Sequence, residues 1–557
     1  MNDAQHTLTL TNSGNYDLVA VLRETLEQSA DNLIIRLPTD TYHISSEGLT
    51  KQFLHISNND SGLKAVALSI CHHQNLTIDG QGSTLLVKGK LIPFLIENCQ
   101  DVILRNFILD WESDYHAELQ VEQSDKDGTV FRVLNNCPVA VIDGRVYFDD
   151  YPDAINPEQY HLHLLEYDTQ KLIPAEKADD FFLNSSYHVD KLSKNTFRVQ
   201  GFTGESFQPS QLFIATNHVR PAPGIVISNS RNVKVENVTV HYALGMAIQA
   251  QHSENVELRH VTVKRSSKRR ISTLADASHF VMCKGHIQLT DCDFSGQLDD
   301  ATNVHGIYGV IYKILDDHTL VVALQHYQQL GTLLGIEHDK VRFLRFPENL
   351  SLGDNQIEHI RCINERFQQI VFADPVPDHL IAGDILENLT LCPDLTIDGC
   401  RFVDNRARGI LITTPGKVLV TRTTFHNPGS AIRVSGDVID WFEAGATRHI
   451  EIVDNKFLDC NYGSSAWGNA TIDVYPAFDM PDGHQYHQYV MICDNQFNTS
   501  SGRLLEARNV GRIEFVNNAI LRSDLHNIHE TGSGYCVLND VDESIISGNT
   551  ESVTERR

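Results

Sequence analysis

The stretch Asn232-Val-Lys-Val-Glu recurs further along the chain as Asn255-Val-Glu-Leu-Arg and again as His286-Ile-Gln-Leu-Thr. Each unit is a polar residue followed by two apolar residues that flank a polar one, the alternation typical of a short β-strand with one buried face. Further units begin, in chain order, at Asn75, Asp101, Asp394, Lys417, His449, Tyr489, Arg512 and Ser544. Apart from two longer intervals, successive units are about 20–40 residues apart, within the range of repeat proteins.

Short strands that return at such an interval, with Asn and Gly turns and no helix between them, are typical of a solenoid. Because each strand is only three to five residues long, the pattern predicts an all-β right-handed parallel β-helix. A β-sandwich or a propeller is the alternative, but a propeller blade repeats at about 40–45 residues, which fits these spacings poorly.

The segment from Asp17 to Ala30 is predicted to form an N-terminal helix that caps the solenoid. Leu18, Leu22 and Leu26 recur every four residues and so lie on one face, behind Asp17 as the N-cap. A cap is needed because the first coil of a solenoid has no neighbour to bury it.

The two longer intervals, from Asp101 to Asn232 and from His286 to Asp394, each leave room for a small inserted domain. The second contains Val310-Ile-Tyr-Lys-Ile-Leu, the turn Asp316-Asp-His-Thr and Leu320-Val-Val-Ala-Leu, which predict a hairpin. Both inserts are expected to be small antiparallel β-barrels. The predicted segments are residues 1–114 with the cap and first coils, 115–222 as the first insert, 223–305 as coils, 306–387 as the second insert, and 388–557 as the final coils.

Composition excludes several classes of function. The 557-residue chain has 27 more acidic than basic residues, which disfavours nucleic acid and anionic membrane surfaces as partners. The eleven cysteines show no zinc-type spacing, and the histidines show no HxxxH or HExxH motif, so we expect neither metal nor cofactor. The first residues lack the basic and apolar segments of a signal peptide, so we expect no export signal in the sequence as it stands.

Three carboxylates are the strongest candidates for chemistry. Asp276 and Asp299 are separated by the commonest interval between units, the one from Asn232 to Asn255, so we expect them to occupy the same place on consecutive coils, with Asp300 beside them. Close carboxylates repel, which raises at least one pKa, and a glycosidase needs one protonated acid and one carboxylate. The alternative is a ladder of Asp side chains that cap backbone N–H groups in turns. The position of this trio between two inserts favours catalysis.

Other residues are expected around the trio. His279 and His305 flank the carboxylates and are predicted to bind substrate or to orient an acid. Arg408 and Asp440 each lie nine residues before the next strand unit, a position close to that of Asp276, and Trp441 follows Asp440. We therefore expect these three to line the same groove, with Trp441 as an aromatic surface for a sugar.

Several segments resemble the α-1,3-galactosidases of glycoside hydrolase family 110, the blood-group-B type, over nearly the whole chain. They are His55-Ile-Ser-Asn-Asn-Asp-Ser-Gly, Ile78-Asp-Gly-Gln-Gly-Ser, Ile92-Pro-Phe-Leu-Ile-Glu, Asp276-Ala-Ser-His-Phe, Asp299-Asp-Ala-Thr-Asn-Val-His-Gly, Asn405-Arg-Ala-Arg-Gly and Asp440-Trp-Phe-Glu-Ala-Gly-Ala. The Asp-Asp-x-x-Asn-x-His-Gly and Asp-Trp-Phe-Glu segments are the most specific. They add Asn303 and Glu443 to the expected substrate-binding residues.

This resemblance implies inverting, metal-free hydrolysis of terminal α-1,3-linked galactose. It implies Asp299 as the general acid, with Asp276 and Asp300 positioning and deprotonating a water molecule. It also implies a galactose-terminated glycan as the partner and a periplasmic or secreted protein. Inserts that reach a second protomer would allow a homodimer.

Two other functions fit a β-helix of this kind. A polygalacturonase-like hydrolase would need basic residues for uronate carboxylates, and its usual Arg-x-Lys signature is not evident. A non-catalytic glycan-binding β-helix, such as a tailspike-like adhesin, would not need the carboxylate trio.

Overall fold

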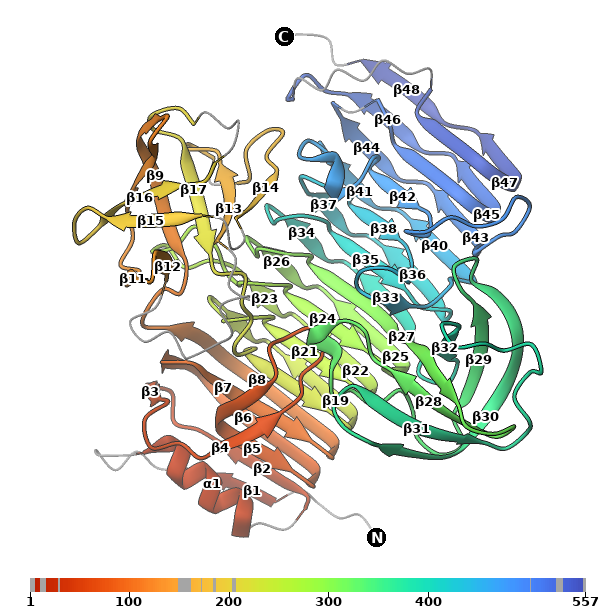
Figure 1. The fold of residues 1–557 in the computed structure, drawn as a ribbon. Helices are drawn as coiled ribbons and strands as arrows, with labels where there is room; N and C mark the ends of the chain where they lie inside the picture. The colour runs from red at the N-terminus through yellow and green to blue at the C-terminus, as the bar shows by residue number, and fades with distance from the viewer. Residues whose placement is uncertain are drawn as a thin grey trace.

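The computed structural model describes residues 6–10, 17–28, 31–148, 162–171, 173–183, 187–202, 207–500, 502–526 and 534–553. These residues form a parallel β-helix that carries two inserted domains, as predicted (Figure 1). The coils stack from the N-terminal end to the C-terminal end, and one continuous apolar core fills their interior. No helix among the described residues is long and apolar enough to cross a membrane.

Three ladders of parallel strands make the walls of the β-helix. The first ladder contains β5 (Gly62–Cys71), β7 (Leu91–Glu97), β18 (Ile225–Ser228), β21 (Ile248–Gln251), β24 (Ser278–Val281), β27 (Thr302–Ile314), β35 (Ile410–Thr413), β38 (Ile432–Val434), β42 (Ile472–Val474), β45 (Leu505–Val516) and β47 (Cys536–Ser547). The second contains β1 (His6–Thr9), β2 (Leu33–Arg36), β6 (Gln74–Lys88), β8 (Gln100–Trp111), β19 (Arg231–Glu236), β22 (Glu254–Arg259), β25 (Lys284–Thr290), β33 (Asp394–Asp398), β36 (Lys417–Thr421), β40 (His449–Val453) and β43 (His487–Cys493).

The third ladder contains β3 (Thr41–Ser45), β20 (Thr239–Val240), β23 (Thr262–Val263), β26 (Asp293–Ser295), β34 (Arg401–Val403), β37 (Thr424–His426), β41 (Lys456–Leu458), β44 (Gln496–Thr499), β46 (Ala519–Arg522) and β48 (Thr550–Val553). The long strands β6 and β8 continue from the second ladder into the third, and β45 and β47 run from the first ladder into the second. Two short strands pair antiparallel with the first ladder: β4 (Lys51–Leu54) with β5, and β39 (Glu443–Ala444) with β27.

The polar residue that opens each repeated unit has a structural role. Asn232 and Asn255 adopt positive φ angles of 55° and 56°, a left-handed bend that asparagine tolerates. The Asn255 side-chain amide donates to Asn232 Oδ1 at 3.0 Å, so the bends of neighbouring coils are joined. In the next coil Gly285 takes the bend, at φ 70°, where a Cβ atom would lie 2.3 Å from Asn255 Oδ1.

The N-terminal cap is helix α1 (Leu18–Gln28). Asp17 Oδ1 accepts from the backbone N–H groups of Val19 and Ala20 at 3.1 and 3.2 Å, which confirms Asp17 as the N-cap. Leu22 and Leu26 are buried against the first coils. The predicted end at Ala30 and the Leu18 side chain lie outside what the structure describes.

The first insert is antiparallel, as expected. Its strands are β9 (Ala117–Asp125), β10 (Gly128–Val133), β11 (Ala140–Ile142), β12 (Arg145–Tyr147), β13 (Leu162–Tyr167), β14 (Asp180–Leu183), β15 (His188–Lys191), β16 (Thr196–Gln200) and β17 (Leu212–Thr216). Seven of them form a sheet in the order β14-β13-β17-β9-β10-β16-β15, while β11 and β12 pair with each other. Among the described residues the edge strands β14 and β15 do not pair, so this sheet is not closed into the barrel that we expected.

The second insert is a closed six-stranded antiparallel barrel. The distal part of β27 continues into β28 (Thr319–Ala323), β31 (Phe367–Phe372), β30 (Leu350–Cys362), β29 (Lys340–Arg345) and β32 (Ile385–Asn388), which pairs back onto β27. The predicted hairpin is the β27–β28 pair, with Ile311 opposite Val322. Both inserts interrupt the chain next to strands of the first ladder, and so they flank its outer face (Figure 1).

Candidate active site

Asp276, Asp300 and Arg408 each stand two positions before a strand of the first ladder. These strands are neighbours, since Ser278 pairs with Thr302 and Thr302 pairs with Ile410. Asp300 is therefore the positional counterpart of Asp276. The expected stacking of Asp276 on Asp299 is wrong by one residue, because the coil at this place is one residue longer than the commonest interval.

Asp300 and Arg408 form an ion pair. Arg408 Nε donates to Asp300 Oδ1 at 2.9 Å, and the Arg408 backbone N–H donates to the same oxygen at 3.2 Å. The Asp300 side chain is only 2% exposed. Burial raises its pKa to about 7, although Arg408 opposes that shift.

Asp299 has a different electrostatic environment. Arg220 Nη2 donates to Asp299 Oδ2 at 2.7 Å, and Arg406 Nη1 donates to Oδ1 at 3.1 Å. The Asp299 side chain is 15% exposed, the most open of the three. Burial alone would raise its pKa, but the guanidinium groups of Arg406 and Arg220 prevail and hold the pKa below the usual value. Asp299 is therefore the ionised member of the trio.

The first insert contributes a buried carboxylate to this cluster. Asp180, on β14, accepts from Arg406 Nε and Nη2 at 2.8 and 2.6 Å. The same carboxylate contacts His163 Nε2 at 2.7 Å and accepts from Trp467 Nε1 at 2.8 Å. Arg406 thus joins Asp180 of the insert to Asp299 of the β-helix.

A chain of hydrogen bonds fixes the proton on Asp276. His305 Nδ1 donates to the Gly306 carbonyl oxygen at 2.7 Å, which leaves its Nε2 as an acceptor in the neutral ring. His279 Nε2 lies 2.8 Å from His305 Nε2 and must be the donor. His279 Nδ1 then accepts, and its neighbour at 2.5 Å, Asp276 Oδ2, carries the proton.

The pKa shifts agree with this assignment. Burial lowers the pKa of His279 to about 3 and that of His305 to about 4, so both rings are neutral at neutral pH. Burial, reinforced by the charge of Asp299, raises the pKa of Asp276 well above its usual value. Asp276 is therefore a neutral carboxylic acid that donates to His279.

Asn303 and Glu443 complete the outer face beside the histidines. Asn303 Nδ2 donates to Glu443 Oε1 at 3.4 Å, and the same oxygen lies 3.4 Å from His305 Nε2. Glu443 reaches this place because β39 pairs antiparallel with β27, opposite Ile307.

Among the residues that the structure describes, His279, His305 and Glu443 form the one group that could hold a metal ion. One atom from each lies within 4.8 Å of the others. A direct Nε2-to-Nε2 hydrogen bond already uses the two imidazoles, and so we assign the group to proton placement.

Trp441 lies at the edge of the cluster. The Arg220 guanidinium stands 5.7 Å from the centre of the Trp441 ring, and the ring of His326 packs against the same indole at 4.2 Å. This position leaves Trp441 half-buried beside the Arg220–Asp299 pair.

The expectation for Asp440 is wrong. Its side chain is exposed, and its backbone N–H is held by Asp437 rather than by a residue of the cluster. Asp437 accepts from the backbone N–H groups of Ile439, Asp440 and Trp441, so this segment is a tight turn that leaves the coil. The prediction for Asp440 counted nine residues back from the next strand unit, and this count holds only where the coil is regular.

Sequence reasoning missed Arg220, Arg406 and Asp180. Arg406 lies in the Asn405-Arg-Ala-Arg-Gly segment, two residues from Arg408, and that segment was the one available signal for it. Arg220 and Asp180 come from the first insert and the connection that follows it, where no repeat fixes the position of a residue.

Comparisons with known proteins agree with this architecture. A family model described as GLAA-B beta-barrel domain II matches residues 319–386, within the second insert. A protein of Shewanella woodyi named alpha-1,3-galactosidase A is 32% identical over 494 residues, which cover 87% of this chain and 80% of the relative. A protein of Phocaeicola vulgatus named alpha-1,3-galactosidase B is 32% identical over 521 residues, which cover 88% and 86%.

Two solved structures were also compared with the chain. The A-module of the Azotobacter vinelandii mannuronan C-5 epimerase AlgE6 has a TM-score of 0.39 and 11% identity, and covers 97% of this chain and 95% of its own. The polygalacturonase of Erwinia carotovora also has a TM-score of 0.39, with 8% identity, and covers 99% and 96%. At these values neither bears on the chemistry.

Proposed function

Since the chain belongs to the α-1,3-galactosidase family, we propose that it releases terminal α-1,3-linked galactose from glycans by an inverting acid–base mechanism. It is a glycoside hydrolase, as its relatives are. The observation that supports the mechanism is the unequal protonation of adjacent carboxylates. The guanidinium groups of Arg220 and Arg406 hold the pKa of Asp299 below its usual value, whereas burial raises the pKa of the neighbouring Asp300 to about 7.

Asp299 is the general base in this proposal. A base must be ionised before the reaction, and the contacts of Arg220 and Arg406 favour the carboxylate form. Asp299 is also the most exposed of the three, so a water molecule can reach it. This differs from the role that the resemblance implied, because a general acid must first hold the proton.

Asp300 is the general acid. Its Oδ1 atom accepts two hydrogen bonds from Arg408, which leaves Oδ2 to carry the proton for the leaving oxygen. A pKa near 7 suits an acid that works at neutral pH. Asp276 stays neutral against His279 and so adds no second negative charge beside Asp299.

The outer face of the first ladder would bind the galactose unit. Asn303 and Glu443 offer polar groups beside the carboxylates, and Trp441 offers an aromatic face. The sugar would lie between the two inserts, above the ends of β24 and β27.

Incubation with the linear disaccharide Galα1-3Gal and with the fucose-branched blood-group-B antigen tests the activity. We expect free galactose from at least one of the two. Release from neither substrate would contradict the proposal. Polygalacturonate serves as a control, and shortening of that polymer would favour the alternative hydrolase.

A further inference from the structure

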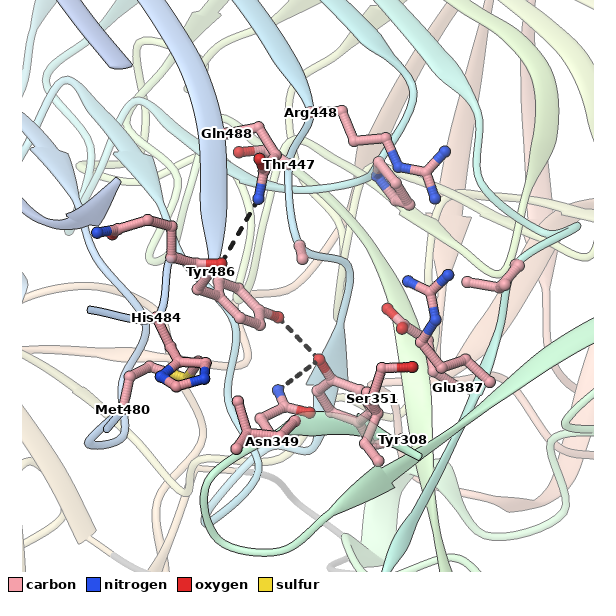
Figure 2. A pocket seen from close by; sticks show the side chains of 17 residues that line it. Tyr308, Asn349, Ser351, Glu387, Thr447, Arg448, Met480, His484, Tyr486 and Gln488 are labelled. Carbon is pink, nitrogen blue, oxygen red and sulfur yellow. Dashed lines mark hydrogen bonds between the residues drawn. The ribbon is translucent and has the colours of Figure 1, made fainter. Parts of the chain in front are cut away.

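A cavity lies between the barrel of the second insert and the C-terminal coils. Its volume is about 440 Å³, within the range of roughly 300–1,000 Å³ for small-molecule sites. Tyr308 and Glu387 line it from the barrel, while Arg448, Met480 and Tyr486 line it from the coils (Figure 2). None of the residues that line it belongs to the carboxylate cluster.

The cavity nevertheless shares two chain segments with that cluster. Tyr308 follows His305 by three residues on β27, and Ala446 follows Glu443 by three residues after β39. His305 and Tyr308 are an odd number of residues apart, so their side chains point to opposite faces of β27. Strand β27 therefore carries the cluster on one face and the cavity on the other.

Glu387 is a buried carboxyl group whose hydrogen-bonding capacity is unused. It is 4% exposed, and no described residue donates a hydrogen bond to its side chain or forms an ion pair with it within 4 Å. Figure 2 shows it on the cavity wall opposite Met480 and His484. Tyr308 and Tyr486 line the same cavity, and burial, with a further contribution from the charge of Glu387, raises the pKa of both hydroxyls. A buried acid without a partner is costly unless a ligand or water completes it.

Other polar groups in the cavity are also incompletely paired. Asn349 Nδ2 donates to the Tyr308 hydroxyl at 3.1 Å, but the Asn349 Oδ1 atom is buried without a partner among the described residues. The Tyr308 and Tyr486 hydroxyls share one hydrogen bond of 2.8 Å, so one hydroxyl hydrogen is left over. The cavity thus offers both donors and acceptors.

The charges around the cavity balance. Arg342 is neutralised by two hydrogen bonds to Asp354, at 2.7 and 3.0 Å. Arg448 is exposed at the rim, where water and salt screen its charge, and burial raises the pKa of Glu387 to about 7. An anion or a cation would meet no excess of opposite charge here. Leu350, Leu389 and Pro415 add an apolar wall.

We propose that this cavity is a second saccharide-binding site that holds a neutral sugar unit of the glycan. A neutral sugar carries donors and acceptors on its hydroxyls and an apolar C–H face, which matches Glu387, Asn349 and the apolar wall. The site would hold the enzyme on glycans that present several galactose termini. Only the choice of sugar rests on the proposed function.

The test is titration calorimetry of full-length Asp299→Asn protein with the trisaccharide Galα1-3Galβ1-4GlcNAc. Glu387→Leu and Arg448→Ala are each added to this background. We expect each of these two substitutions to raise the dissociation constant of one set of binding sites at least tenfold. Arg448 is exposed, so its substitution cannot act through misfolding of the core. Binding curves that neither substitution changes would overturn the proposal.

Glu358→Gln is the matched control, since Glu358 is an exposed acid on β30 of the same barrel. It should leave the binding curve unchanged. Hydrolysis of Galα1-3Gal by the unmodified enzyme reports on the proposed function separately, so failure of one proposal is distinguishable from failure of the other.

Discussion

Asp180 of the first insert holds Arg406 of the β-helix through two hydrogen bonds of 2.8 and 2.6 Å, between segments far apart in the sequence. The Arg406 guanidinium contacts Asp299 with its remaining nitrogen, Nη1, at 3.1 Å. The insert therefore positions a group that keeps the proposed base ionised. Asp180 acts on Asp299 through Arg406, and so it is a positioning residue.

Replacement of Asp180 by Asn should lower kcat by about 100-fold, because a guanidinium that is no longer fixed misplaces Asp299. KM should change much less. Loss of one member of a buried pair should also cost about 3 kcal/mol of stability. Steady-state kinetics and thermal unfolding of the same preparation check both. Asp190→Asn, an exposed acid on β15 of the same insert, is the control, and kcat equal to that of this control would contradict the positioning role.

Replacement of Arg408 by Gln should move the pH profile in a direction that depends on the role of Asp300. The guanidinium favours the ionised form of Asp300, so its removal raises the pKa of that carboxyl group. An acid must be protonated, and kcat/KM of the unmodified enzyme should therefore fall above about pH 7. In the variant this fall should begin at higher pH. If instead the rising, acidic limb of the kcat/KM profile moves to higher pH, Asp300 is the base.

Replacement of Asp299 by Asn should cost several orders of magnitude in kcat with Galα1-3Gal, while the fold remains intact. Added azide should restore part of the activity and give β-galactosyl azide, because a small nucleophile can replace the water that a missing base no longer activates. A substrate with a good leaving group, such as a dinitrophenyl α-galactoside, should not restore it. The reverse pattern would make Asp299 the acid, as the family resemblance implied.

Glu387 should make the stability of the protein depend on pH. Burial raises its pKa to about 7, so the folded state keeps a proton that the unfolded chain has already lost. Stability should therefore fall as pH rises from about 4.5 to about 7, by about 3 kcal/mol at about 1.36 kcal/mol per pKa unit. Glu387→Leu should remove this part of the decline. Thermal unfolding at several pH values measures it, and parallel curves for the two proteins would contradict the buried, unpaired state of Glu387.

The sequence predicted the β-helix because the same physical requirement recurs in every coil. Asn232 and Asn255 mark the bends, and the apolar pair after each bend points into the core. The closed barrel of the second insert was also predictable, since its first hairpin has alternating strands and an Asp-rich turn. The first insert was predicted as antiparallel, but nothing in its sequence indicated an open sheet.

The site could be predicted only in part. The Asp-Asp-x-x-Asn-x-His-Gly segment placed Asp300, Asn303 and His305 correctly on one coil, but that coil is one residue longer than expected, which shifted the partner of Asp276 by one position. The protonation state of Asp299 could not be predicted from the sequence, because Arg220 and Arg406 contact it from distant parts of the chain. Long-range contacts of this kind leave no periodic signal.

The configuration of the galactose first released from Galα1-3Galβ1-4GlcNAc, which yields only one free galactose per cleavage, tests the central claim most directly. Proton NMR resolves the α and β anomers before they interconvert. An ionised base and a protonated acid on opposite sides of the bond predict β-galactose as the initial product. Initial release of α-galactose would show a retaining reaction and would contradict the proposed mechanism.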